Sequence, residues 1–210
     1  RQRGALPRPL CPTADGSLMS CGDGGVYKWE LSTGERTRIC GEGTWSDVAV
    51  SRSGRTMIAA CDRSDPSGPV IVMDLSTGTH RRVASHEQDV NAVAIDATGE
   101  RIATGAGNGV VRVGRVTGEE PHLLIGHREL VNTLAFSPDG RWLASASGTE
   151  ILLWPMPDLS KPPLHTLPRE ELLAKLQSLT NLRAVRDPNS ATGWTIEVGP
   201  FPGWRDVPTW

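Results

Sequence analysis

The chain has 210 residues, and its 22 lysines and arginines against 24 aspartates and glutamates give a formal net charge of −2. With 38% hydrophobic and 22% charged residues, it has neither the composition of a disordered chain nor the basic balance of a nucleic-acid binder. No run approaches the ~20 apolar residues of a membrane-spanning helix. We therefore expect a folded chain whose partners are neither nucleic acid nor a membrane.

The ends and the cysteines give two further expectations. The sequence begins at Arg1 and its opening has no apolar stretch of the signal-peptide type, so we interpret it as part of a longer chain. The four cysteines, Cys11, Cys21, Cys40 and Cys61, lack the spacing of a metal site. They are typical of small buried side chains in a reducing compartment, which predicts a cytoplasmic location.

A repeat governs the first three quarters of the chain. Four turn signals occur at Thr13–Gly16, Ser51–Gly54, Asp96–Gly99 and Ser137–Gly140, and the intervals between their glycines are 38, 45 and 41 residues. A period of about 40–45 residues is typical of a propeller blade built from four strands. The longest interval contains Asp62–Gly68, which we interpret as an insertion in one hairpin loop.

Each unit predicts strands at the same offsets from its turn glycine. In the fourth unit the runs are Leu134–Phe136, Leu143-Ala144 and Ile151–Trp154, and His122–Ile125 leads into that unit. Short runs of this kind, separated by Gly, Asp and Ser turns, indicate strands rather than helices. Together with 23 glycines and 16 prolines, this predicts an all-β fold of about four blades over residues 1–160.

The last fifty residues have a different character. Pro168–Leu179 begins with a proline and two glutamates, which is typical of a helix N-terminus. Leu182–Val185 and Gly193–Val198 flank a polar turn, and the second run alternates, which predicts a hairpin. We expect a small α+β extension over residues 161–210.

The fourth unit carries a family resemblance. Its Gly126-His127, Val131, Leu134–Gly140, Leu143–Ser145 and Trp154 resemble the WD-repeat family of β-propellers, and the likeness covers roughly residues 5–160. The resemblance implies a partial WD-repeat β-propeller. Because an open propeller exposes sheet edges, we expect upstream blades or another chain to complete the ring.

The resemblance also implies a polar tetrad in each blade, formed by a His before the first strand, a Ser or Thr on the second, an Asp in the next turn and a Trp on the third. By position, the matching residues are His127, Ser145 and Trp154 in the fourth unit, His86, Thr104 and Asn108 in the third, and Asp23 and Trp29 in the first. The other places are taken by Thr149 near the acidic place of unit four, by Val113 for Trp in unit three and by Cys21 for Ser or Thr in unit one. The second unit has none of the four.

Variable polar residues around the starts of the first strands predict a partner-binding rim. This candidate rim consists of Ser46, Glu87, Asp89, Asn91, Arg128, Glu129 and Asn132. Loops on a rigid scaffold are where recognition usually occurs. For each residue singly, an ordinary solvated loop is the alternative that the sequence leaves open.

No recurring constellation indicates catalysis, a metal or a cofactor. Gly105–Gly109 lacks the spacing and the following helix of a dinucleotide loop, and Asp62–Gly68 lacks the spacing of a calcium loop. His86 and His127 have no carboxylate or nucleophile recurring beside them, and they occupy the place of a structural His. We expect no catalytic residues, no metal ligands and no cofactor in this chain.

The sequence therefore predicts a non-enzymatic protein–protein interaction scaffold that presents blade loops to protein partners. An alternative comes from the tail, because Gly199–Trp204 and Trp210 resemble the ends of large bacterial WD-repeat signalling proteins. In that alternative the chain is the sensor or regulatory end of a signalling enzyme, such as a Ser/Thr protein kinase, whose catalytic module lies upstream of Arg1. A propeller hydrolase, the third alternative, would require acidic residues that converge at the axis.

Overall fold

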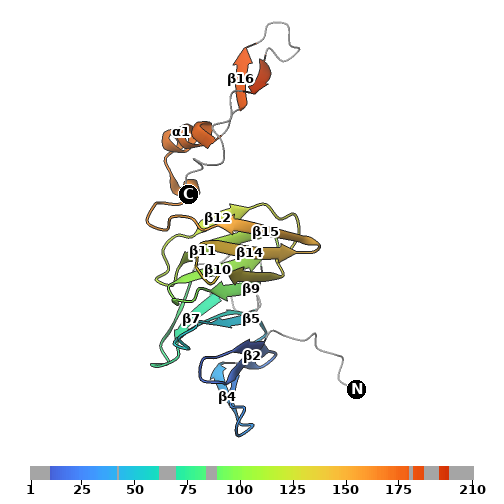
Figure 1. Ribbon diagram of the computed structural model, residues 1–210, viewed down its shortest axis with the longest axis vertical. Helices are drawn as coiled ribbons and strands as arrows, with labels where there is room; N and C mark the ends of the chain where they lie inside the picture. Colours follow the sequence, from blue (N-terminus) through green and yellow to red (C-terminus); the bar gives the residue numbers. More distant parts are fainter. Residues whose placement is uncertain are drawn as a thin grey trace.

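A computed structural model describes residues 10–41, 43–61, 70–83, 89–179, 182–186 and 194–198, and of residues 176–179, 182–186 and 194–198 it describes the backbone alone. Successive antiparallel sheets follow one another through residues 10–155. In Figure 1 the sheets of residues 10–40 and 45–82 lie one above the other, and those of residues 90–125 and 133–155 overlap in the view. The expected all-β partial propeller with a small C-terminal extension is confirmed. Among the described residues, no helix has the length and hydropathy needed to span a bilayer.

Each sheet is one blade, and its strands lie side by side in chain order. Blade 1 contains β1 (Leu10–Pro12), β2 (Leu18–Gly22), β3 (Gly25–Trp29) and β4 (Arg36–Cys40). Blade 2 contains β5 (Trp45–Val50), β6 (Thr56–Cys61), β7 (Val70–Asp74) and β8 (His80–Arg82). Blade 3 contains β9 (Val90–Ile95), β10 (Arg101–Ala106), β11 (Val110–Arg115) and β12 (His122–Ile125), and blade 4 contains β13 (Thr133–Phe136), β14 (Trp142–Ser147) and β15 (Glu150–Pro155).

The turn between the first two strands of a blade is built on its glycine. Gly99 and Gly140 have φ angles of 80° and 67°, in the left-handed region that L side chains rarely adopt. The amide of Gly99 donates to the carbonyl of Asp96, and that of Gly140 donates to the carbonyl of Ser137. The repeated turn signals of the sequence therefore mark real chain reversals at the same place in successive blades.

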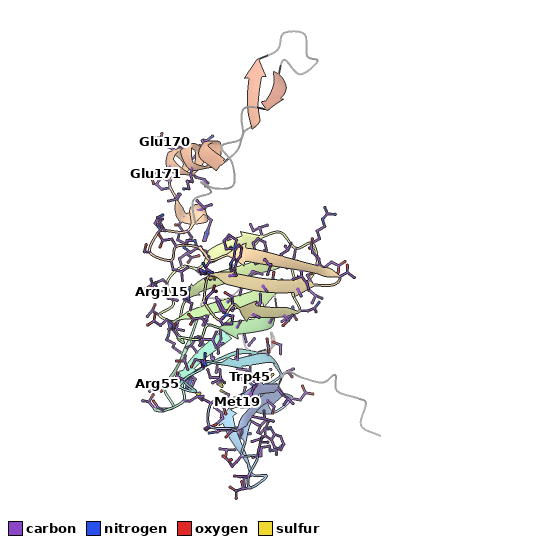
Figure 2. The ribbon with its side chains drawn as sticks, viewed as in Figure 1. Met19, Trp45, Arg55, Arg115, Glu170 and Glu171 are labelled. Atoms are coloured by element: carbon purple, nitrogen blue, oxygen red, sulfur yellow. The ribbon has the colours of Figure 1, made fainter. Side chains whose placement is uncertain are left out.

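Apolar side chains form three layers, one between each pair of neighbouring blades. Met19 and Trp45 lie in the layer between blades 1 and 2 (Figure 2). In β6, Met57 contributes to that layer, whereas its neighbour Ile58 contributes to the layer between blades 2 and 3. Because successive strand residues point to opposite faces, the two middle blades bury both of their faces. Each blade is thereby held by its neighbours.

The chain leaves blade 4 after three described strands. Met156 is buried in the layer between blades 3 and 4, and the following segment turns back to blade 3, where the carbonyl of Lys161 lies 3.2 Å from Nε2 of His122. The short helix η1 (Leu164–Thr166) contacts β12. As a result, β15 is the last described strand of its sheet.

The C-terminal extension has the predicted elements. Helix α1 (Arg169–Leu179) carries Glu170 and Glu171 in its first turn, and β16 (Leu182–Arg186) pairs antiparallel with β17 (Trp194–Val198). The boundary between residues 160 and 161 stays a prediction. The insertion Asp62–Gly68 lies outside the described residues.

Candidate functional site: the blade relay and the loop rim

In blade 4, four residues from three segments meet in a polar relay. His127 precedes β13 and is buried, and its Nε2 lies 2.6 Å from Oγ of Ser145 on β14. The indole Nε1 of Trp154 on β15 donates to the same Oγ over 2.7 Å. Nδ1 of His127 lies 3.1 Å from Oε2 of Glu150, and the imidazole meets the indole edge-on with ring centroids 6.3 Å apart.

The direction of the relay follows from its chemistry. A carboxylate only accepts hydrogen bonds, so Nδ1 of His127 must carry a proton and donate to Glu150. Ser145 accepts from the Trp154 indole and donates its own hydroxyl proton to Nε2 of His127. Each donor proton then takes part in one hydrogen bond, from Trp154 to Ser145, from Ser145 to His127 and from His127 to Glu150. These bonds fix the loop before β13 against the sheet.

The acidic end of this relay is Glu150 rather than Thr149, the residue that the sequence placed near that position. The turn between β14 and β15 contains only Gly148 and Thr149, and Glu150 is the first residue of β15, paired with Ser147. From there its carboxylate reaches back to the imidazole. A glutamate one residue later replaces the expected residue in the turn.

In blade 1 the indole partner is Ser20 and not Cys21. Nε1 of Trp29 donates to Oγ of Ser20 over 2.8 Å, whereas Cys21 is buried in the layer between blades 1 and 2. The first turn of blade 1 is one residue shorter than that of blade 4, and a one-residue slip moves a side chain to the other face. Asp23, the expected acid, is exposed, and its backbone forms an isolated bridge with Thr44.

Blade 3 contains tetrad positions without an indole. Thr104 is buried on β10, but Asn108 is exposed and its Oδ1 accepts the amide proton of Val110, so it shapes the turn. Ile102 pairs with Gly114 as Leu143 pairs with Trp154, which puts Gly114 at the structural place of the Trp. The assignment of Val113 to that place is therefore wrong by one residue. His86 lies outside the described residues.

The predicted rim residues divide into structural and exposed ones. The hydroxyl of Ser46 is half-buried and donates to the carbonyl of Val90 over 2.6 Å, so it links blades 2 and 3 rather than lining a rim. Asp89 and Asn91 are half-buried, and the side-chain amide of Asn91 donates through Nδ2 to the backbone carbonyl of Asp89 over 3.4 Å. Glu87 lies outside the described residues.

The exposed rim residues gather where blades 3 and 4 meet. Arg128, Glu129 and Asn132 are exposed, and so are Leu130 between them and Asn108 on the neighbouring turn. We call these five residues the blade 3–4 rim. Sequence reasoning missed Leu130, although an apolar residue inside a charged loop was a usable signal.

The loop that carries this rim is held from both sides. The amide of Val131 donates to the carbonyl of Ala106 in blade 3, and the amide of Asn132 donates to the carbonyl of Ala146 in blade 4. A Cβ on Gly109 would come within 2.5 Å of the carbonyl oxygen of His127, so the turn before β11 needs glycine to approach the loop. The exposed side chains therefore stand on a fixed backbone.

A groove of about 740 Å³ opens between blades 1 and 2. Met19, Ile39 and Leu75 form its apolar lining. The two cations on its walls are neutralised within the groove region, because Lys28 lies 2.6 Å from Asp15 and Arg55 lies 3.2 Å from Asp74. Neither of these two cations is therefore an unpaired charge that a ligand in the groove could bind.

Two carboxyl groups, that of half-buried Asp47 and that of buried Asp96, have shifted pKa values. Burial raises the pKa of Asp47 to about 6, although its carboxylate accepts the amide protons of Val93 and Val48. Burial also acts to raise the pKa of Asp96, but the hydrogen bonds from Arg101 and Thr98 outweigh it and lower that pKa. Among the described residues, no three His, Cys, Asp or Glu side chains gather as a metal site would require.

Comparison with known proteins gives the same architecture. Residues 78–113 and 118–155 match the family model described as WD domain, G-beta repeat. Human apoptotic protease-activating factor 1 is 29% identical over 137 residues, which are 60% of this chain and 11% of that protein. The guanine nucleotide-binding protein subunit beta of Zea mays is 27% identical over 155 residues, which are 65% of this chain and 40% of that protein.

A solved structure agrees at the level of the fold. A chain in the crystal structure of the mitotic checkpoint complex has a TM-score of 0.62 and 19% identity, and the match covers 72% of this chain and 49% of that one. The chain thus spans less than half the length of these relatives. Its successive antiparallel blades define a β-propeller repeat protein. Residues 78–113 and 118–155 therefore match two WD repeats, and the chain is similar to proteins that carry such repeats.

Proposed function

We propose that this chain is a non-enzymatic scaffold that binds a protein partner at the blade 3–4 rim. The observation that carries the proposal is the combination of exposed side chains and a fixed loop. Leu130 is 45% exposed and stands beside one cation, Arg128, and one anion, Glu129. Contact sites commonly combine a central apolar side chain with a charged edge.

A partner that fits this rim presents an apolar side chain flanked by charges of both signs. Such a partner would cover Leu130 and pair with Arg128 and Glu129 at the edge. Because the loop is already held by Val131 and Asn132, binding would cost little ordering entropy. The kinase alternative stays a prediction, since it concerns residues upstream of Arg1.

The test compares partner recovery by matched variants. Wild-type protein, Leu130→Asp and the control Leu31→Asp are used as baits in cell extract, with quantitative mass spectrometry of the bound proteins. Leu31 is 61% exposed on blade 1, away from the rim. Proteins bound by the wild type and by Leu31→Asp but lost with Leu130→Asp support the rim, and equal recovery by all three baits contradicts it.

A cytoplasmic location is proposed on the state of the cysteines. All four are free thiols, and three of them are buried in the first two blades. Burial raises the pKa of the Cys40 thiol to about 11, which keeps it protonated and unreactive. Location of the tagged protein by microscopy tests the proposal.

A further inference from the structure

The two end blades each present one apolar face on which no described blade packs. On blade 4 this face consists of Ala135, Ala144, Ala146, Ile151 and Leu153, and we call it the blade 4 open face. Ile151 and Leu153 are 71% and 66% exposed, which is unusual for aliphatic side chains in the middle of a strand.

On blade 1 the corresponding face carries large side chains. It consists of Leu10, Pro12, Leu18, Tyr27 and Trp29, and we call it the blade 1 open face. Leu10 is 63% exposed, and the guanidinium of Arg36 lies 4.5 Å from the ring centroid of Tyr27 and 5.5 Å from that of Trp29. The aromatic pair is therefore covered by one cationic side chain rather than by a neighbouring blade.

The blade 4 open face repeats the face that blade 3 turns toward blade 4. On blade 4, Ala144 pairs with Ala135 on one side and with Leu153 on the other. On blade 3, Ala103 pairs in the same way with Ala94 and Val113, and all three are buried in the layer shared with blade 4. Both faces thus have small residues on the first two strands and an aliphatic residue on the third.

The blade 1 open face repeats the other half of the same junction. Leu18 pairs with Pro12 and Trp29. Leu143 pairs with Phe136 and Trp154, and these three pack against the small residues of blade 3. The Trp29 indole also donates to Ser20 as the Trp154 indole donates to Ser145. One chain therefore displays the two unlike halves of a junction that it already forms internally.

We propose that a second copy of this chain docks head to tail, with its blade 1 open face on the blade 4 open face of the first. The small residues of blade 4 accept the bulky residues of blade 1, as those of blade 3 accept blade 4 at the internal junction. Repeating the contact with the second copy's blade 4 closes a ring of two chains. Two sets of four blades give eight, within the range of closed propellers, and a head-to-tail contact that closes makes a ring. The contact does not involve the blade 3–4 rim.

The oligomeric state of the chain tests this contact. Light scattering after size-exclusion chromatography should give twice the mass of one chain for the wild type, and one chain mass for Leu153→Arg, which puts a charge in the middle of the face. Leu173→Arg is the matched control, because Leu173 is 47% exposed on α1 and belongs to neither face. A monomeric wild type, or a Leu153→Arg variant that still dimerises, overturns the proposal.

Disulfide trapping tests the head-to-tail orientation. At the internal junction, a Cβ on Gly105 would lie 3.4 Å from Cδ1 of Leu134. Their counterparts are Ala146 and Leu10, so Ala146→Cys protein mixed with Leu10→Cys protein should form a mixed disulfide dimer. Disulfides that form only between two Ala146→Cys chains indicate a like-with-like contact and overturn the orientation. The absence of any cross-link between chains overturns the contact itself.

Discussion

Asp96 closes the turn between β9 and β10 as a buried carboxylate. Its Oδ1 accepts the amide protons of Gly99, Glu100 and Arg101 over 2.9, 3.0 and 3.1 Å, and its Oδ2 accepts from Nε of Arg101 over 2.8 Å. The same guanidinium donates to the carbonyl of Gly140 in blade 4 over 2.9 Å. One residue thus organises its own turn and, through Arg101, the position of the next blade.

Replacing Asp96 with alanine should destabilise the chain by about 3–5 kcal/mol, because the change leaves Arg101 without its carboxylate in a partly buried place. Urea unfolding followed by circular dichroism measures the change. Asp139→Ala is the matched control, since Asp139 holds the equivalent turn of blade 4 at an exposed site, through Ser137 and Arg141. An Asp96→Ala effect no larger than that of Asp139→Ala contradicts the structural role.

The relay of blade 4 makes a second prediction at the residue scale. Ser145→Ala removes the shared partner of the Trp154 indole and the His127 imidazole, and it should cost about 1–3 kcal/mol because both polar groups then lose a hydrogen bond. Ser20→Ala, the control in blade 1, removes one indole partner in a less buried sheet and should cost less. Thermal unfolding measures the loss of stability in each variant. Equal losses in Ser145→Ala and Ser20→Ala contradict the relay.

At the scale of the elements, the sequence is informative because strands alternate and turns need glycine. The runs around Gly140 predicted β13, β14 and β15 for this reason. What the sequence could not give is the register, because a turn that differs by one residue changes which side chain faces which layer. The sequence predicted Cys21 and Val113 at two tetrad places where the structure has Ser20 and Gly114, and both errors are of this kind.

The hydrogen bonds between β5 and β9 could not be predicted from the sequence either. Ser46 lies at a position that loop variability marks as a contact rim, yet its hydroxyl donates to the carbonyl of Val90. Next to it, Asp47 accepts the amide proton of Val93 over 2.7 Å. Two polar residues of blade 2 therefore satisfy backbone groups of blade 3, and only the packing of one blade on another reveals it.

Asp47 gives a pH dependence to the contact between blades 2 and 3. Its pKa is raised to about 6 in the folded chain by burial, from an ordinary value of 3.8. The folded state therefore binds the proton more tightly, and the free energy of unfolding should fall by at most about 3 kcal/mol as the pH rises from 4 to 7. Denaturant unfolding across that range measures the slope.

Asp47→Asn should flatten this slope, because the amide does not titrate. Asp158→Asn is the control, since hydrogen bonds from Ser160 lower the pKa of Asp158 and its titration lies below the window. If Asp47→Asn keeps the wild-type slope between pH 4 and 7, another group is responsible.

At the scale of the whole molecule, the four repeated blades and the apolar layers between them form one body that has two end blades. Because the three layers fix the blades, the loops between blades carry exposed side chains on a fixed backbone. The blade 3–4 rim is one such loop region. The partial propeller and the likeness to WD repeats could be predicted from the repeat period and the motif around Trp154. The docking of the exit segment on blade 3 through His122 could not, because nothing in its sequence indicates that partner.

Site-specific photo-cross-linking tests most directly whether the rim binds protein. A photoreactive amino acid is placed at Leu130 on the rim or, as the control, at Leu31 on blade 1, and both proteins are irradiated in cells. A discrete adduct from position 130 that is absent from position 31, and that disappears when Arg128→Glu is added, is the expected result. Equal adducts from both positions, or none from position 130, contradict a partner-binding rim.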